Sequence, residues 1–339
     1  MFSLASSVIT NHLYVMKEEL LPDLQKAREE YLASGDEDLL PIIDAHHHFW
    51  DMRNPHPWLT ELPRIPFRYG DYEAICKDFL PADYAAACGA HRILRHVVME
   101  GEWTPDDPAG EALWMHSLSQ RCGKPHAMAA QIWLNRFDAE TLMQTYAQPP
   151  LRGFVRSVRH KPFCAKREDY RNNWTEPGSM RCPQWRKGYE KLATHGLMFE
   201  LQAPWWHMEE AAELARDFPR TRIIVNHAGL PETRDTETLK QWRVAMLELV
   251  PYANIYIKIS GIGVRGEPWT VEQQRPVVET LITTFGVSRC LFASNHPVDA
   301  IVVTLDDLWS RFKALTRKLS PEQRLALFCD NAVALYGLR

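Results

Sequence analysis

The stretch that decides the fold is Ile42-Ile43-Asp44-Ala45-His46-His47-His48, a short apolar run that passes directly into three histidines. A short, largely apolar run of this kind is typical of a buried strand. Because successive side chains on a strand alternate between its two faces, His46 and His48 share one face and His47 takes the other. We therefore expect a buried strand that ends in two imidazoles on the same side.

The rest of the chain repeats one pattern, an apolar run followed by a loop and an amphipathic stretch. The predicted strands are Ile42–Ala45, Ile93–Met99, Ala127–Trp133, Gly153–Val158, Met198–Leu201, Ile223–Val225, Ile255–Ile259 and Leu291–Ala293. The predicted helices are Pro81–Cys88, Glu111–Gln120, Asp138–Tyr146, Trp185–His195, Glu209–Phe218, Thr236–Leu249, Thr270–Phe285, Leu305–Leu319 and Pro321–Tyr336.

Eight strands that alternate with helices imply a parallel sheet of the α/β class. Eight units match a closed (β/α)₈ TIM barrel better than an open doubly wound sheet, and no GxGxxG motif follows the first strand. We predict one barrel domain over residues 41–339, preceded by an N-terminal helical extension over residues 1–40 that is helical around Lys17–Ser34. Long insertions follow the first and fourth strands, and loops of that length usually cover active sites.

Composition excludes several classes of function. The formal net charge is -4, and Lys and Arg are scattered, so neither a nucleic-acid surface nor a polybasic membrane patch is indicated. No run approaches the roughly 20 apolar residues that a membrane span requires. The seven cysteines include no CxxC pair, which favours a reducing compartment. We expect a cytoplasmic protein with a small-molecule substrate; homo-oligomerisation is compatible with such a barrel, although no feature specifies it.

Polar residues follow nearly every predicted strand, where barrel enzymes place their catalysis. His46 and His48 can converge on one divalent metal, and nitrogen ligands suit zinc. His227 follows the sixth strand and extends the pair to a three-histidine cluster able to activate water or polarise a carbonyl. The alternatives are histidines that hydrogen-bond to loops and, for His227, a structural cap.

The remaining strand ends supply charge and aromatic surface. Arg156 and Arg159 end the fourth strand and are suited to bidentate capture of a carboxylate, or to an ion pair with a loop acid. Lys258 on the seventh strand either contacts substrate or pairs with Glu200. Trp103 after the second strand either stacks on a substrate ring or packs under the loops.

Several of these segments, in order, resemble the second amidohydrolase family, a branch of the amidohydrolase superfamily that contains sugar-acid and dicarboxylate lactonases. The segments that carry the resemblance are Asp44–Asp51, His96–Trp103, Arg159–His160, Val225–Pro231, Tyr256–Gly261, Phe292–Asp299 and Asp330–Tyr336. They span about residues 41–339; each motif alone is weak, and the ordered set is specific.

The resemblance implies a (β/α)₈ barrel that opens lactones by attack of water on the ester carbonyl. It matches His46 and His48 to the first-strand pair of the family and His227 to its sixth-strand histidine. Arg159 matches a fourth-strand arginine that holds substrate carboxylate or hydroxyl groups. A divalent metal, zinc first, would polarise the carbonyl or lower the pKa of its water; a metal-independent reaction that relies on positive side chains is the alternative.

The chain departs from the family at Asn295, where the superfamily places an aspartate as metal ligand and general base. An amide cannot accept a proton from water at neutral pH. Asp299, four residues on, is our first candidate for the base, with a loop or helix-cap carboxylate as its alternative reading. The other candidates for the base are His296, Glu100, Glu102 and His47.

Three functions compete at this stage. The first is a lactonase acting on a sugar-acid or dicarboxylate lactone. The second is a metal-dependent decarboxylase or hydratase on a similar barrel. The third is a non-catalytic barrel that binds a small molecule, which the presence of Asn295 favours and the full set of other polar strand ends opposes.

Overall fold

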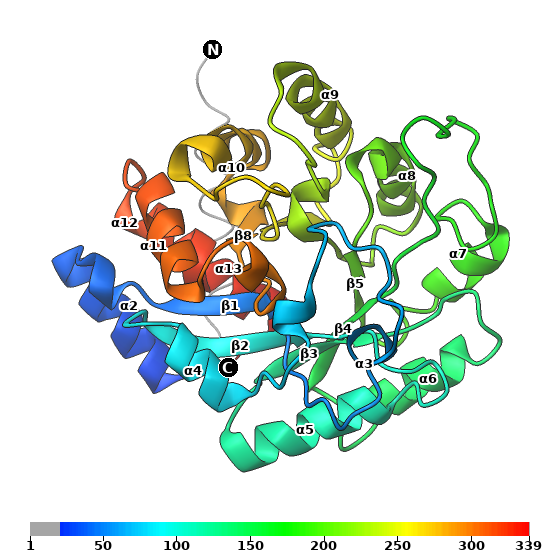
Figure 1. Ribbon diagram of the computed structural model, residues 1–339, viewed down its shortest axis with the longest axis horizontal. Coiled ribbons are helices and arrows are strands. Elements are labelled where there is room, and N and C mark those ends of the chain that lie inside the picture. Colours follow the sequence, from blue (N-terminus) through cyan, green and yellow to red (C-terminus); the bar gives the residue numbers. More distant parts are fainter. Residues whose placement is uncertain (1–20, 339) are drawn as a thin grey trace.

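The computed structural model describes residues 21–338, and its elements carry the labels of Figure 1. Eight parallel strands pair in the order β1 to β8. They are β1 (Ile42–His47), β2 (Ile93–Met99), β3 (Ala127–Gln131), β4 (Val155–Arg159), β5 (Met198–Leu201), β6 (Ile223–Val225), β7 (Ile255–Ile259) and β8 (Cys290–Phe292). The predicted (β/α)₈ barrel is confirmed, and each predicted strand is present within a few residues of its expected bounds.

The helices surround these strands in Figure 1. They are α2 (Pro22–Ser34), α3 (Pro57–Thr60), α4 (Pro81–Ala87), α5 (Gly110–Cys122), α6 (Ala139–Tyr146), α7 (Pro183–Tyr189), α8 (Met208–Asp217), α9 (Thr236–Leu247), α10 (Val271–Phe285), α11 (Leu305–Leu315), α12 (Pro321–Leu325) and α13 (Asn331–Tyr336). The short turns are η1 (Glu37–Leu39), η2 (Glu73–Ile75), η3 (Trp205–His207), η4 (Asn226–Gly229), η5 (Val287–Arg289), η6 (Val298–Ile301) and η7 (Ala326–Asp330).

Three helical predictions differ from the structure, one of them at its end only, because the helix expected over Leu305–Leu319 stops at Leu315. The single helix expected over Pro321–Tyr336 is divided into α12, the π-helical segment η7 and α13. The helix expected from Trp185 to His195 ends at Tyr189. Of the extension, α2 is described, and residues 1–20, which include the expected start of its helix, lie outside the described part. Within residues 21–338 no helix has the length and apolar character needed to cross a membrane.

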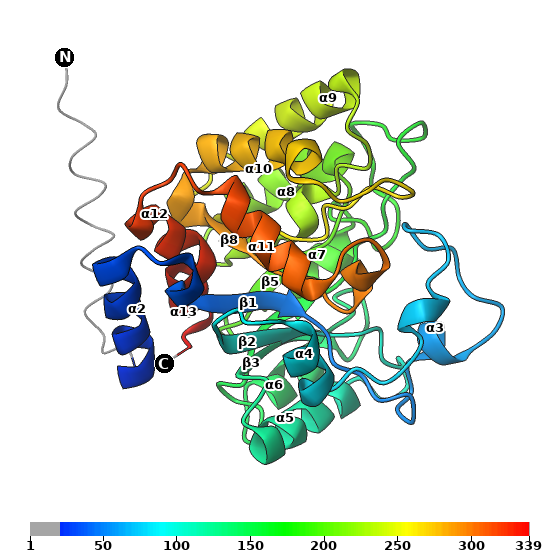
Figure 2. The ribbon, with the colours of Figure 1, turned by 60° about the vertical axis from the view of Figure 1, so that its left-hand side comes forward.

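Figure 2 separates the two ends of the barrel. Helix α2 lies beside the tail of the β1 arrow, whereas the insertion that carries α3 extends from its head. Leu24 and Tyr31 of α2 are buried, and Arg28 pairs with Asp330 at 2.8 Å. The tail end is therefore covered by helices and ion pairs, and the carboxyl end of the strands lies under long loops.

The barrel closes between its first and last strands. The backbone N–H of Asn295 donates to the His46 carbonyl at 2.6 Å, and the His48 N–H donates to the His296 carbonyl at 2.7 Å. These bonds lie just beyond the carboxyl end of β8. They hold the end of β1 beside the Asn295 segment.

The buried carboxylate of Asp44 reinforces this closure. It accepts hydrogen bonds from the backbone N–H of Ser294 at 2.9 Å, the Ser294 hydroxyl at 2.5 Å and the Tyr84 hydroxyl at 2.7 Å. The pairing of β1 with β2 shifts register between Asp44 and His47. A bulge of this kind re-aims side chains, and it allows Asp44 to fasten β1 to its neighbours while His46 joins the site.

Candidate active site

His46, His48 and His227 come together at the carboxyl end of the barrel. The ring centroids of His46 and His227 are 4.6 Å apart, and those of His46 and His48 are 5.4 Å apart. All three side chains are buried, and burial, followed by neighbouring positive groups, lowers each pKa well below the usual value. They are therefore neutral imidazoles at pH 7. His47 lies on the other face of β1, where its ring meets those of Tyr84 and His96.

The backbone around His227 is shaped to bring its ring to this cluster. His227 has a φ of 55°, a left-handed conformation that is uncommon outside glycine, and its Nδ1 lies 2.9 Å from the Ser260 hydroxyl. Gly261 has a φ of +55°, and a Cβ added there would lie 2.5 Å from His227 Nδ1. Only glycine gives the ring this room, and strained backbone of this kind clusters at functional sites.

Asn295 and Asp299 form the β8 side of the site. Asn295 has a φ of 54°, and its side-chain amide donates to Asp299 Oδ1 at 2.8 Å. Asp299 is fully buried, and its Oδ2 has no hydrogen-bond partner among the described residues. Burial raises the pKa of Asp299 to about 6. This arrangement suits a general base.

Two residues of the insertion after β1, Arg68 and Tyr69, also reach this carboxylate. The Tyr69 hydroxyl lies 3.1 Å from Asp299 Oδ1, and Arg68 Nη2 lies 3.4 Å from the same oxygen. Arg68 also donates to the Gly261 carbonyl at 2.8 Å. Neither residue was among the predicted site residues; the only signal for them was the length and the aromatic and arginine content of the insertion.

Arg159 and Glu100 form a buried ion pair beside the histidines. Arg159 Nε donates to the Glu100 carboxylate, its Nη2 donates to the Glu100 carbonyl at 2.6 Å, and its Nη1 donates to Gln202 at 3.1 Å. Its charge acts on all three histidines of the cluster. The guanidinium is thus engaged by the protein itself, which is the ion-pair alternative rather than an open carboxylate clamp.

Lys258 is likewise paired inside the barrel. Its ammonium lies 2.8 Å from Glu200 Oε2, and both side chains are fully buried. Burial lowers the pKa of Lys258 to about 8, against the opposing effect of Glu200. Lys258 is also among the positive groups that lower the pKa of His46. It therefore places a buried positive charge near the cluster.

Two predicted substrate-binding residues are placed differently. Arg156 lies three residues before Arg159, so the alternation of β4 directs it to the other face, where it donates to the Gly337 carbonyl at 3.3 Å. Trp103 packs edge-on against His56 and stacks near Trp114 under the loops. The structure does not bring either side chain to the histidine cluster.

Of the other candidates for the base, two are committed elsewhere. His296 is buried, with its ring nitrogens 3.3 Å and 3.2 Å from the carbonyls of Ser294 and Val303. Glu102 pairs with Lys161. Among the candidate carboxylates, Asp299 keeps a buried oxygen without a partner in the described residues.

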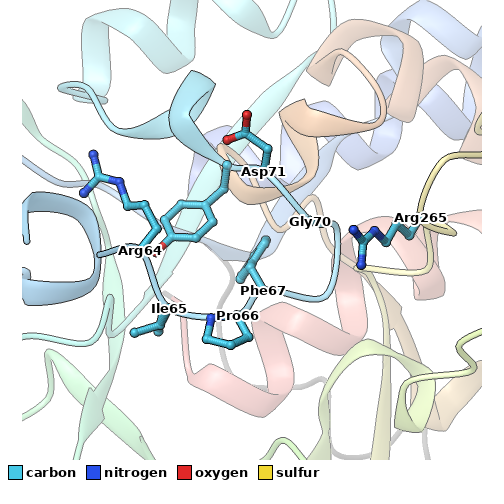
Figure 3. Close-up of a pocket in the computed structure, with 8 residues that line it drawn as sticks. Arg64, Ile65, Pro66, Phe67, Gly70, Asp71 and Arg265 are labelled. Atoms are coloured by element: carbon cyan, nitrogen blue, oxygen red, sulfur yellow. The ribbon is translucent and has the colours of Figure 1, made fainter. Parts of the chain in front are cut away.

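A shallow pocket opens in the insertion next to Arg68 and Tyr69. Figure 3 shows Arg265, which follows β7, facing Gly70 of the insertion across it. The other lining residues include Arg64, Phe67 and Tyr72. The loops after β1 and β7 therefore meet above the barrel mouth.

A family model for amidohydrolases matches residues 43–338. The chain belongs to the amidohydrolase family. It is therefore a hydrolase, and the non-catalytic barrel is not the function. The resemblance stated from the motifs is confirmed.

Two curated proteins and one solved structure place this amidohydrolase among its relatives. The uncharacterized protein y4mH of Sinorhizobium fredii is 38% identical over 299 residues, which cover 88% of this chain and 98% of that protein. An L-fucono-1,5-lactonase of Burkholderia ambifaria is 25% identical over 301 residues, which cover 87% and 95%. The crystal structure of an amidohydrolase from Burkholderia multivorans with bound zinc has a TM-score of 0.70 at 18% identity, covering 88% of this chain and 99% of that one.

The histidine nitrogens of this amidohydrolase are of the type that binds a metal such as zinc. Both ring nitrogens of His46 and Nδ1 of His48 are buried without a hydrogen-bond partner among the described residues, and neutral imidazole is a preferred zinc ligand. In residues 21–338, however, no three His, Cys, Asp or Glu side chains form a group arranged to hold a metal ion. The neutral histidines are thus available as ligands or as hydrogen-bond partners of a substrate.

Proposed function

We propose that this amidohydrolase opens the ester ring of a small lactone, a sugar-acid or dicarboxylate lactone, by attack of an activated water. The observation that carries the proposal is the buried, unpartnered Oδ2 of Asp299 in a site with three neutral histidines. The likeness to an L-fucono-1,5-lactonase supports the same reaction class.

Asp299 is the proposed base. Its Oδ1 is held by Asn295, Tyr69 and Arg68, which leaves Oδ2 to accept the proton of the attacking water. A pKa of about 6 keeps the carboxylate ionised at neutral pH and makes it a stronger base than an exposed aspartate. In this scheme Asn295 orients the base rather than replacing it.

The positive and neutral donors of the site stabilise the transition state. Attack on the carbonyl places negative charge on its oxygen, and Lys258 and Arg159 provide fixed positive charge near the histidines. His227, whose Nδ1 is occupied by Ser260, keeps Nε2 for the substrate or for a metal. Preorganised charge of this kind in a site closed to water is usually the largest single contribution to catalysis.

The proposed reaction balances with water as the only co-reactant. The water oxygen bonds to the carbonyl carbon while one of its protons passes to Asp299 Oδ2. The ring carbon–oxygen bond then breaks, and the alkoxide that leaves takes the proton back from Asp299. The product is a hydroxy acid, which releases one proton to solution at neutral pH.

By donor type, His46, His48 and His227 would hold a divalent metal, for which zinc is our first proposal. Such an ion would polarise the lactone carbonyl. A metal assay on the purified protein tests this proposal, with about one zinc per chain expected and with activity lost on chelation. Metal-free protein with full activity would remove the ligand role and leave the lactonase proposal in place.

A pH-indicator screen over a panel of lactones tests the reaction. The wild type should release acid, and a His46→Ala/His48→Ala double variant should lose that release while His195→Ala, which lies outside the site, keeps it. Absence of acid from every lactone, together with carbon dioxide release from an aromatic acid, would favour the decarboxylase instead.

All seven cysteines are free thiols, which supports the proposed cytoplasmic location.

A further inference from the structure

The positively charged side chains of the site differ in how many of their hydrogen-bond donors are already paired within the protein. Arg159 makes three hydrogen bonds to Glu100 and Gln202, and Lys258 is paired with Glu200 in a fully buried position. A substrate carboxylate would have to break a buried ion pair to reach either one, which is costly. A cation that selects an anionic substrate must therefore lie elsewhere.

The guanidinium of Arg68 makes weaker and fewer contacts with acidic groups of the protein. Its Nη1 donates to the Gly261 carbonyl and its Nη2 to the Tyr69 hydroxyl, both at 2.8 Å, whereas its contact with Asp299 is 3.4 Å long. No hydrogen bond from its Nε–H is found within residues 21–338. Its side chain is 30% exposed, compared with 1% for Asp299. The guanidinium is thus anchored through its two terminal nitrogens by few contacts, and the side chain is partly exposed to solvent.

Arg68 also lies next to the reacting groups. A Cβ added at Gly261 would meet His227 Nδ1 at 2.5 Å and Arg68 Nη2 at 2.7 Å, so the two side chains lie side by side over this glycine. Arg68 is the strongest charged influence on His227. The guanidinium is stacked over the Tyr69 ring at 4.3 Å, which fixes its plane.

We propose that Arg68 is the specificity-determining residue of this enzyme and that it binds a carboxylate carried by the lactone ring. The inference rests on the proposed lactonase function and names the substrate class within it, an anionic lactone. The planar fork of a guanidinium donates two parallel hydrogen bonds to a carboxylate. A carboxylate bound there lies beside the ring that His227 and Asp299 act on.

The test compares two lactones that differ at one carbon, a sugar-acid lactone with a terminal carboxylate and its analogue with a hydroxymethyl group. The wild type should prefer the carboxylate in kcat/KM by about 10- to 100-fold, as expected for a charge-assisted pair. Arg68→Met should lower kcat/KM for the carboxylate lactone about 10- to 100-fold more than kcat/KM for the neutral lactone, chiefly through KM. Any weaker support of Asp299 in this variant affects both lactones equally, so the ratio between them reports carboxylate recognition alone. Arg265→Met is the matched control, because Arg265 is exposed on the rim of the neighbouring pocket; it should keep the preference.

Two results would overturn the inference. One is an unchanged preference in Arg68→Met; the other is an equal loss on both lactones, which would restrict Arg68 to supporting Asp299. Calorimetric titration with the ring-opened hydroxy dicarboxylate separates this inference from the proposed function, because it needs no turnover. Weaker binding to Arg68→Met than to Arg265→Met supports carboxylate recognition even where no lactone is hydrolysed, and equal binding rejects it.

Discussion

Two buried polar regions of this barrel differ in how completely their side chains are hydrogen-bonded. In the inner network (Ser157, Glu200, Asn226, Lys258 and Tyr336) the Glu200 carboxylate accepts hydrogen bonds from all four of the other side chains, and Asn226 Oδ1 is the atom of this network without a partner in the described chain. In the mouth cluster (His46, His48, His227, Asp299 and Arg68) both nitrogens of His46 and one oxygen of Asp299 have no partner in the described chain.

Apart from the partly exposed Arg68, the side chains of both regions are buried, so what distinguishes the regions is whether their polar groups have hydrogen-bond partners. A buried polar group with its partners in place stabilises the fold, whereas one left without partners costs about 1–3 kcal/mol. Such groups are uncommon in native proteins and are concentrated at functional sites. We therefore assign the inner network to the stability of the barrel and propose that the mouth cluster binds a ligand. Each of the following predictions tests one side of this division.

The largest expected effect is at the mouth. Asp299→Asn removes the proposed base and should lower kcat/KM by about 10²- to 10⁴-fold. The melting temperature should stay the same or rise, because a buried carboxylate that resists ionisation is replaced by a neutral amide. Steady-state kinetics and thermal melts measure the two effects. A rate within threefold of the wild type would assign the base to another residue.

The next effect belongs to the inner network. Glu200→Leu leaves the ammonium of Lys258 buried without its partner, and we expect the free energy of unfolding to fall by about 3–5 kcal/mol. Urea unfolding measures this change. A double variant, Glu200→Leu with Lys258→Met, serves as the control and should recover much of the loss because no charge remains buried. A single variant as stable as the wild type would contradict the structural role given to this pair.

A smaller, reversible effect should appear in the pH profile of kcat/KM. The base acts only when ionised, so activity should fall as pH drops through about 6, the raised pKa of Asp299. Activity should also decline above about 8, where Lys258 loses its charge. We expect a bell-shaped curve, with a roughly tenfold loss at pH 5 relative to the plateau. In Lys258→Met the basic limb should disappear; its persistence would remove Lys258 from the profile.

The smallest effect concerns the edge of the inner network. Tyr336→Phe deletes one donor to Glu200 and leaves Ser157 on the same carboxylate oxygen. The expected loss is about 1–2 kcal/mol of unfolding free energy with kcat/KM nearly unchanged. A large fall in activity without a fall in stability would show that the two regions are coupled rather than separate.

Much of the fold was predictable from local patterns. The buried strands of a parallel barrel are apolar on both faces, so short runs such as Ile223–Val225 stand out from their surroundings. The division of Pro321–Tyr336 was not predictable, because the π-helical segment Ala326–Asp330 interrupts neither the apolar pattern nor the helix propensity. Its cause lies in packing against the barrel, with Leu327, Phe328 and Cys329 all buried.

The site was predictable where strand ends define it. The carboxyl ends of parallel strands share one edge, so His46, His48, His227 and Asp299 could be expected together from their order in the chain. Arg68 lies 231 residues before Asp299, in a loop without periodicity, and no local rule connects the two. The pairing of Arg159 with Glu100 and of Lys258 with Glu200 also needed the structure, since the sequence left each cation open to substrate or partner.

The closure of the barrel between β1 and β8 has a consequence for how the enzyme is made. Asp44 and Ser294 are 250 residues apart, and the Asn295–His46 backbone bond joins the same two segments. A chain still on the ribosome can display its histidine pair long before Asn295 and Asp299 have been synthesised. Catalytic activity therefore begins only after translation has passed the eighth strand, and its appearance during synthesis would report that the first and last strands have met.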